Sequence, residues 1–120
     1  MLREAILKRI ETLPAAGIDQ PFREDFDSTV LRHTDTGKWF GLLFHAPASQ
    51  FPRFPADAQG VELLNLKCPP DLSQLLQSQY EAIQPAYHMN KRHWISVILS
   101  GALPEEELFQ LIRLSYDLTK

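Results

Sequence analysis

The chain has 120 residues, 44% of them hydrophobic and 22% charged, and its 12 Lys and Arg against 15 Asp and Glu give a formal net charge of −3 at pH 7. These values are typical of one globular domain over residues 1–120 and exclude fibrous and disordered chains. The acidic balance also excludes a strongly basic nucleic-acid-binding domain, so any contact with nucleic acid must use a local patch.

The cellular compartment is indicated by features that the sequence lacks. No apolar stretch approaches the roughly 18 residues of a membrane span, and charged residues occupy the N-terminus, where a signal peptide would be apolar. The lone Cys68 cannot form an intramolecular disulfide, which is typical of a reducing compartment. We therefore expect a cytoplasmic protein with no membrane contact, and we expect a monomer.

Residues 2–13 have the spacing of one short amphipathic helix. Its apolar side chains recur every three or four residues and share a face, which consists of Leu2, Ile6, Ile10 and Leu13. Pro14 predicts the end of the helix. Residues 15–23 are expected to be irregular, because they include Gly, Asp and Pro, which favour turns.

A β-hairpin is predicted next. Phe26 to His33 reads as a strand, Thr34 to Gly37 as a tight reversal, and Lys38 to His45 as the antiparallel return strand. The return strand is apolar on both faces, so we expect it to be central in a sheet. Strict alternation would place three of its side chains on one face, namely Phe40, Leu42 and Phe44.

The segment from Ala46 to Gly60 is predicted to be a long surface loop. Its three prolines lack backbone donors, which makes both helix and sheet unfavourable. Phe51 and Phe54 are expected to tether this loop to the body of the protein, because apolar area left in water costs about 25 cal/mol per Å².

A strand and a helix are predicted after the loop. Val61 to Lys67 has strand composition, and Pro69-Pro70-Asp71 suits a helix start, because a proline at the first position loses no bond and an early carboxylate meets the positive end of the helix dipole. The apolar stripe of this helix is expected to consist of Leu72, Leu75, Leu76 and Tyr80.

The last part of the chain predicts further strand and a final helix. Ile83 to Tyr87 should be extended, and the apolar run from Trp94 to Leu99 should be a central strand. Pro104 and three successive glutamates open the final helix. Its buried face is expected to consist of Leu108, Leu111, Ile112, Ser115 and Leu118.

Together these elements predict an α+β protein. We expect a two-layer sandwich in which three helices pack on one face of an antiparallel sheet of about five strands, in the order α-β-β-β-α-β-β-α. The short connections between the first strands favour this arrangement over a doubly wound parallel sheet.

The densest group of functional side chains lies between Gln84 and Trp94. No acidic residue occurs between Glu81 and Glu105, so Lys91 and Arg92, with His88 and His93 beside them, form a local cationic patch. Lysine and arginine can contact phosphates, and the neighbouring Tyr87 could offer a stacking surface.

Other chemistries have weaker signals. The four histidines, His33, His45, His88 and His93, show no zinc-finger or HExxH spacing, although His33 and His45 could face each other across the hairpin. Cys68 lies before a predicted helix start, which could activate a thiol, but a buried and inert cysteine is the commoner outcome. We therefore expect no metal, no cofactor and no catalytic residues, and we do not expect an enzyme.

Three stretches carry a resemblance to a known family. Leu64 to Cys68, Tyr87 to Trp94, and Ser115 to Leu118 resemble the MmcQ/YjbR family, and the hairpin tip from Gly37 to Phe40 is similar to its central part. The resemblance implies a small bacterial protein with a two-layer, double-wing fold that is similar to secretion-chaperone-like and frataxin-like arrangements. It also implies DNA as a ligand.

The family motif maps onto Asn90, Lys91, His93 and Trp94, with Lys67 on an earlier strand. The residues expected to bind nucleic acid are Lys91, Arg92, His88, His93, Asn90, Lys67, Lys38 and Tyr87. Two of the motif residues also have a structural interpretation, in which Asn90 fixes a turn and Trp94 anchors the core. The alternative function is a protein-interaction or chaperone-like module whose partner contacts the loop that bears Phe51 and Phe54.

Overall fold

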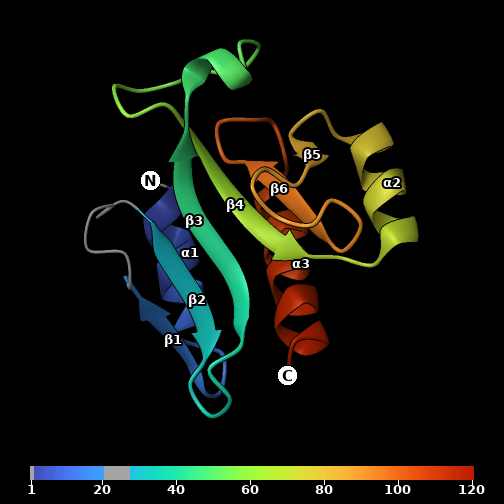
Figure 1. The fold of residues 1–120 in the computed structure, drawn as a ribbon. Coiled ribbons are helices and arrows are strands. Elements are labelled where there is room, and N and C mark those ends of the chain that lie inside the picture. Colours follow the sequence, from blue (N-terminus) through green and yellow to red (C-terminus); the bar gives the residue numbers. More distant parts are fainter. Residues whose placement is uncertain (1, 21–27) are drawn as a thin grey trace.

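The structure is a computed structural model that describes residues 2–20 and 28–120 (Figure 1). The described segments form three α-helices, six strands and a short 3-10 helix at Ala48–Gln50. The bounds are α1 (Leu2–Ile10), β1 (Ala16–Asp19), β2 (Thr29–His33), β3 (Trp39–Ala46), β4 (Val61–Lys67), α2 (Pro70–Gln79), β5 (Ile83–Pro85), β6 (Trp94–Ile98) and α3 (Glu105–Leu118). No helix in these segments is long and apolar enough to cross a membrane.

The six strands form one antiparallel sheet in the order β1-β2-β3-β4-β6-β5. Helices α1 and α3 lie behind the sheet in Figure 1, and α2 lies beside the β5 edge. The predicted α+β class and the central positions of β3 and β6 are confirmed. We call the sheet face that carries α1 and α3 the helical face, and the opposite face the open face.

Strand β1 was not predicted from the sequence, and neither was the short 3-10 helix at Ala48–Gln50, which lies in the segment expected to be loop. Strand β1 pairs with β2 from Ala16 opposite His33 to Asp19 opposite Val30. Its sequence contains turn-forming residues, and Ile18 is exposed, so pairing with β2 rather than local propensity stabilises it. The sheet therefore has six strands instead of about five. Residues 26 and 27, which were assigned to the next strand, lie outside the described part of the chain.

The main hydrophobic core lies between the sheet and the helices. Its buried members include Ile6, Ile10, Leu31, Leu43, Leu64, Leu66, Ile95, Val97, Leu108, Leu111 and Ile112. Helix α1 ends at Ile10, earlier than predicted, although Leu13 still packs against this core. Two predicted core positions are wrong, because Leu75 is 52% exposed and Leu118 is 43% exposed.

A second cluster lies on the open face. Its buried members are Phe44, Ala46, Val61, Leu63 and Ile98. Phe51 and Phe54 from the loop, and Tyr87 from the segment after β5, pack against it. The prediction that the two phenylalanines tether the proline-rich segment is therefore confirmed.

A β-bulge in β3 reverses the side-chain alternation at its start. Leu31 is opposite Gly41, but Arg32 is opposite Trp39, so Phe40 is an extra residue without a partner on β2. The ring of Phe40 lies on the helical face, 5.4 Å from the ring of Tyr116 in α3. The prediction that Phe40 shares a face with Leu42 and Phe44 is wrong, and the bulge directs Trp39 to the open face instead.

Candidate functional site

The cationic loop, which we define as residues 86–93, is fastened to the open face by a closed ring of hydrogen bonds. Asn65 on β4 and Ser96 on β6 are directly opposite each other and fully buried. The Tyr87 N–H donates to Ser96 Oγ at 2.8 Å, Ser96 Oγ donates to Asn65 Oδ1, and Asn65 Nδ2 donates to the Tyr87 carbonyl at 2.8 Å. Both backbone groups of Tyr87 are thereby fixed to the sheet.

Asn90 shapes the end of the cationic loop. Its Oδ1 accepts hydrogen bonds from the backbone N–H groups of Arg92 at 2.9 Å and His93 at 3.0 Å, and its carbonyl accepts one from Trp94 at 3.0 Å. This side-chain turn confirms the structural interpretation of Asn90. The His93 carbonyl accepts the Cys68 N–H at 2.8 Å, which joins the loop to the end of β4.

The side chains of the cationic loop divide into two groups. The Tyr87 ring packs beside those of Phe44 and Phe51, with centroids 6.1 and 5.8 Å away, so it belongs to the second cluster. The His88 ring lies 4.0 Å from that of Tyr87, and the His88 backbone has a positive φ of 63°. The remaining polar side chains of the loop, Asn90, Lys91, Arg92 and His93, are exposed.

Beside the loop, cations and indoles alternate across four strands of the open face. Arg32 on β2 is opposite Trp39 on β3, with its guanidinium carbon 6.0 Å from the centroid of the indole ring, and Lys67 on β4 is opposite Trp94 on β6. All four are partly buried. We call them the indole–cation row. Trp94 belongs to neither core cluster, so the prediction that it anchors the core is wrong.

Ser115 of α3 holds the strands together where the bulge interrupts the β3–β4 ladder. The last ladder pair is Gly41 with Leu66. Beyond it, the fully buried Ser115 Oγ accepts the Lys67 N–H at 2.9 Å and donates to the Phe40 carbonyl at 2.5 Å. One hydroxyl thus replaces a direct strand-to-strand bond at the point where Trp39 and Lys67 reach the open face.

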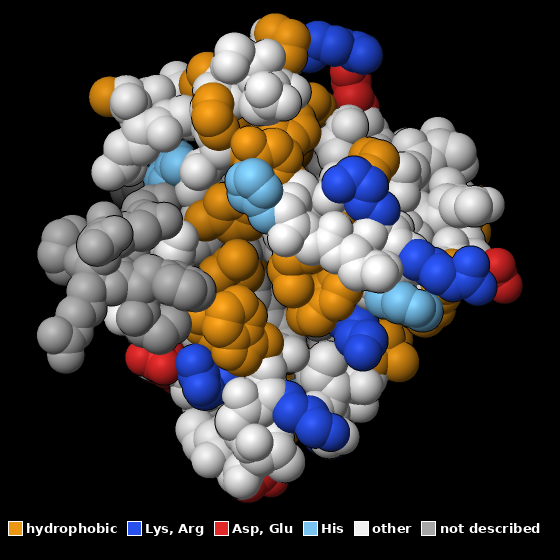
Figure 2. Space-filling view, in the orientation of Figure 1, with side chains coloured by type: hydrophobic (Ala, Val, Ile, Leu, Met, Phe, Trp, Pro, Cys, Tyr) orange, Lys and Arg blue, Asp and Glu red, His pale blue; other side chains and the backbone are white. Residues whose placement is uncertain are grey.

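The predicted cations of the site have no ion-pair partner in the described part of the chain. They are Lys38, Lys67, Lys91 and Arg92, and only Lys67 among them is partly buried. By contrast, Arg32 is paired with Asp19 at 3.0 Å, and Arg53 is paired with Glu81. Figure 2 looks onto the open face and shows Lys and Arg side chains around exposed hydrophobic areas, while the coloured acidic side chains lie toward its margins.

The histidines form no common site. His33 is buried on the helical face, where its Nε2 lies 2.8 Å from Thr119 Oγ1, whereas His45 Nε2 lies 3.4 Å from Asp57 Oδ2. The suggestion that His33 and His45 face each other is therefore wrong. A hydrogen bond from the Gln59 N–H lowers the pKa of Asp57. Within residues 2–20 and 28–120, no three His, Cys, Asp or Glu side chains form a group that could hold a metal ion.

Cys68 is 2% exposed, and burial raises the pKa of its thiol to about 11. The nucleophilic form of cysteine is the thiolate, so this thiol is inert at neutral pH. The interpretation of Cys68 as a small buried hydrophobe is confirmed.

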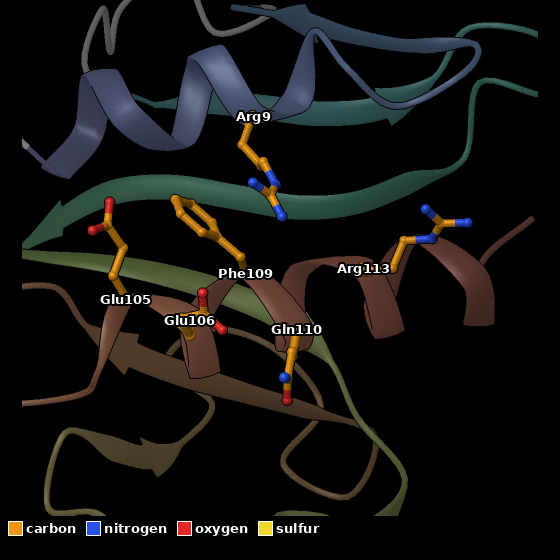
Figure 3. A pocket seen from close by; sticks show the side chains of 6 residues that line it. All are labelled: Arg9, Glu105, Glu106, Phe109, Gln110 and Arg113. Carbon is orange, nitrogen blue, oxygen red and sulfur yellow. The ribbon is translucent and has the colours of Figure 1, made fainter.

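A cavity of about 440 Å³ lies on the other side of the molecule, between α1 and α3. Figure 3 shows Arg9 directed toward the Phe109 ring, with Glu105 and Glu106 from the start of α3 in the same wall. The Arg9 guanidinium lies 4.8 Å from the centre of that ring, and Arg113 is hydrogen-bonded to Asp117. Because charges of both signs line it and its cations have partners, this cavity is a poorer candidate for an anionic ligand than the open face.

Several known proteins are similar to this chain in sequence or in structure. An uncharacterised protein of Bacillus subtilis, YyaQ, is 38% identical over the full chain and 99% of its own length. The uncharacterised YjbR of Escherichia coli is 40% identical over 83% of the chain and 73% of its own length. A crystal structure of a Pseudomonas syringae protein matches all of both chains with a TM-score of 0.85 at 35% identity. The YjbR family model matches residues 11–118, and the chain therefore belongs to the YjbR family.

Proposed function

We propose that the chain is a nucleic-acid-binding module that uses the cationic loop, the adjoining indole end of the open face, which we define by Trp39, Lys67 and Trp94, and Lys38, which directly precedes Trp39 in the chain. The observation that supports this proposal most is a group of four cations that have no ion-pair partner among residues 2–20 and 28–120, namely Lys38, Lys67, Lys91 and Arg92. Cations that no carboxylate neutralises are available for phosphate oxygens.

Binding by this module should be weak and sensitive to salt. Four phosphate contacts on duplex DNA predict a slope of log affinity against log salt of about −3.6, because each contact contributes about 0.9. This slope is shallow compared with that of about −10 for a strongly basic repressor. The net charge of −3 opposes long-range attraction, so binding should become measurable only at low ionic strength.

The test is a salt titration of binding to a labelled random duplex, followed by fluorescence anisotropy. Replacing Lys91 and Arg92 together by alanine should remove about two units of slope and weaken binding to all sequences alike. The matched control replaces Lys8 and Arg9, two exposed cations of α1, which changes the net charge by the same amount.

Two results would contradict the proposal. One is the absence of salt-dependent binding by the unaltered protein at low ionic strength. The other is an equal loss of binding in the Lys91/Arg92 variant and in the Lys8/Arg9 control, since that would reflect overall charge alone.

The geometry favours a protein-interaction module less. Phe51 and Phe54, the side chains expected to contact a partner, are partly buried against the second cluster. Aromatic side chains that already cover the protein's own core are poorly available as anchors for another protein.

A further inference from the structure

We infer that the indole end binds single-stranded nucleic acid, with unpaired bases stacked on Trp39 and Trp94. This inference rests on the proposed function and adds to it the form of the ligand. It follows from the indole–cation row, in which each indole has a cation on a neighbouring strand of the same face. Sequence-tolerant binding of single strands commonly combines cations for the backbone with aromatic rings for the bases.

The position of the indoles argues against a duplex as the preferred ligand. Trp39 on β3 and Trp94 on β6 are separated by one strand, β4, so their backbones lie about 10 Å apart. In a duplex the faces of the bases are covered by their neighbours, and only the edges can be reached in the grooves. Partly exposed indoles on a sheet face can therefore contribute more to binding single-stranded nucleic acid than to binding a duplex.

The same spacing between the two indoles specifies the conformation of the bound nucleic acid. Bases along one strand of a helix rise by about 3.4 Å per residue, which is much less than the separation of the two indoles. Bases held on both rings would therefore be unstacked from each other. Lys67, on the strand between the indoles, is placed to contact the backbone of the same ligand. A strand that stacks poorly on itself, such as oligo(dT), should be preferred over oligo(dA).

The chain offers a direct optical readout of this contact. It contains two tryptophans, and they are the two indoles of the row. Stacking of a base on an indole quenches its emission, so tryptophan fluorescence reports on this surface alone. Trp39→Phe and Trp94→Phe each leave a single tryptophan, so the emission of each position can be followed alone. The phenylalanine keeps an aromatic ring at the substituted position.

The experiment compares four probes of equal length at low salt: oligo(dT), oligo(rU), a DNA duplex and an abasic strand that has phosphates without bases. Oligo(dT) should quench the emission and bind about a hundred-fold more tightly than the abasic strand, because each of the two stacked bases contributes about ten-fold. Oligo(rU) should behave similarly, because the proposed contacts involve base faces and phosphates.

Substitutions then test the rings themselves. Trp39→Leu and Trp94→Leu keep apolar bulk without the aromatic face, and each should lower the affinity for oligo(dT) by about ten-fold while leaving duplex binding nearly unchanged. The phenylalanine variants should retain most of the affinity. Phe109→Leu, at a partly buried aromatic of α3 on the helical face, is the matched control and should leave binding unchanged.

The outcomes separate this inference from the proposed function. Equal binding of all the probes without quenching, combined with a loss of salt slope in the Lys91/Arg92 variant, would overturn the stacking inference and leave the proposed function intact. Absence of salt-dependent binding to every probe would overturn both. If a leucine variant proves unfolded by circular dichroism, the phenylalanine variants and the abasic strand decide the matter.

Discussion

At one end of the open face, Phe44, Leu63 and Ile98 are buried beneath side chains from two loops. At the other end, Trp39, Lys67 and Trp94 are only partly buried. We call the first the covered end and keep the name indole end for the second. The covered end of this sheet face thus stabilises the fold, because side chains of the loops bury it. The indole end remains partly exposed and carries residue types that can bind nucleic acid.

The two ends also differ in how the backbones of β3 and β4 are hydrogen-bonded to each other. At the covered end, β3 and β4 pair without interruption as far as Ala46 opposite Val61. At the indole end the pairing stops, and Ser115 connects the strands instead. The bulge that ends the ladder is also what directs Trp39 to the open face, so local irregularity and the candidate site coincide.

The largest expected effect is on the stability of the fold, and it should differ between substitutions at the two ends. Leu63→Ala removes a fully buried side chain of the covered end and should lower the free energy of unfolding by about 2–5 kcal/mol. Trp94→Leu, at the indole end, should cost only about 1 kcal/mol, because a partly exposed side chain leaves a smaller cavity. Urea denaturation measures both losses of stability. A greater loss for Trp94→Leu would show that the indole end stabilises the fold more than the covered end does.

Ser115→Ala should have the next largest effect. Removing the hydroxyl leaves the Lys67 N–H and the Phe40 carbonyl without their partner in a buried site, which should lower the free energy of unfolding by about 2–3 kcal/mol. Ser78→Ala is the control, because Ser78 is exposed and its hydroxyl bonds only within α2. Equal stability of the two variants would show that water readily replaces the Ser115 bridge.

Asn90→Ala should have a smaller effect that is confined to the cationic loop. Losing the acceptor for the Arg92 and His93 N–H groups should cost about 1 kcal/mol and speed their hydrogen exchange. Asn90→Asp keeps the acceptor and should retain the protection. Unchanged exchange in Asn90→Ala would mean that the ring of bonds at Tyr87 alone orders the loop.

The smallest effect concerns Cys68, whose raised pKa keeps the thiol neutral. Alkylation by iodoacetamide should be very slow at pH 7 and should become fast only when the protein is unfolded, because the reactive thiolate is scarce and the sulfur is buried. Rapid alkylation of the folded protein would show that the segment between β4 and α2 opens readily.

Much of the fold followed from local pattern. The apolar runs predicted β4 and β6, and the proline and acidic residues at the start of α2 predicted that helix. Strand β1 could not be predicted in this way, because it is stabilised by pairing with β2 rather than by its own residues.

The candidate site was only partly predictable for a related reason. Lys91, Arg92 and the turn-forming Asn90 are adjacent in sequence, so their composition revealed the cationic loop. The contribution of Trp39 was hidden, because regular alternation assigns it to the same face as Gly41, and only the bulge reverses that assignment. The bonds that Asn65 and Ser96 make to Tyr87 depend on the β4–β6 register, which the sequence does not specify.

The most direct test of the central claim is a map of backbone amide chemical-shift changes on adding oligo(dT) at low salt. We expect the changed amides to cluster at Trp39, Lys67, Trp94 and the cationic loop, with the covered end and α1 unaffected. Changes centred instead on Arg9 and Phe109, beside the cavity between α1 and α3, or no changes at any position, would contradict this claim.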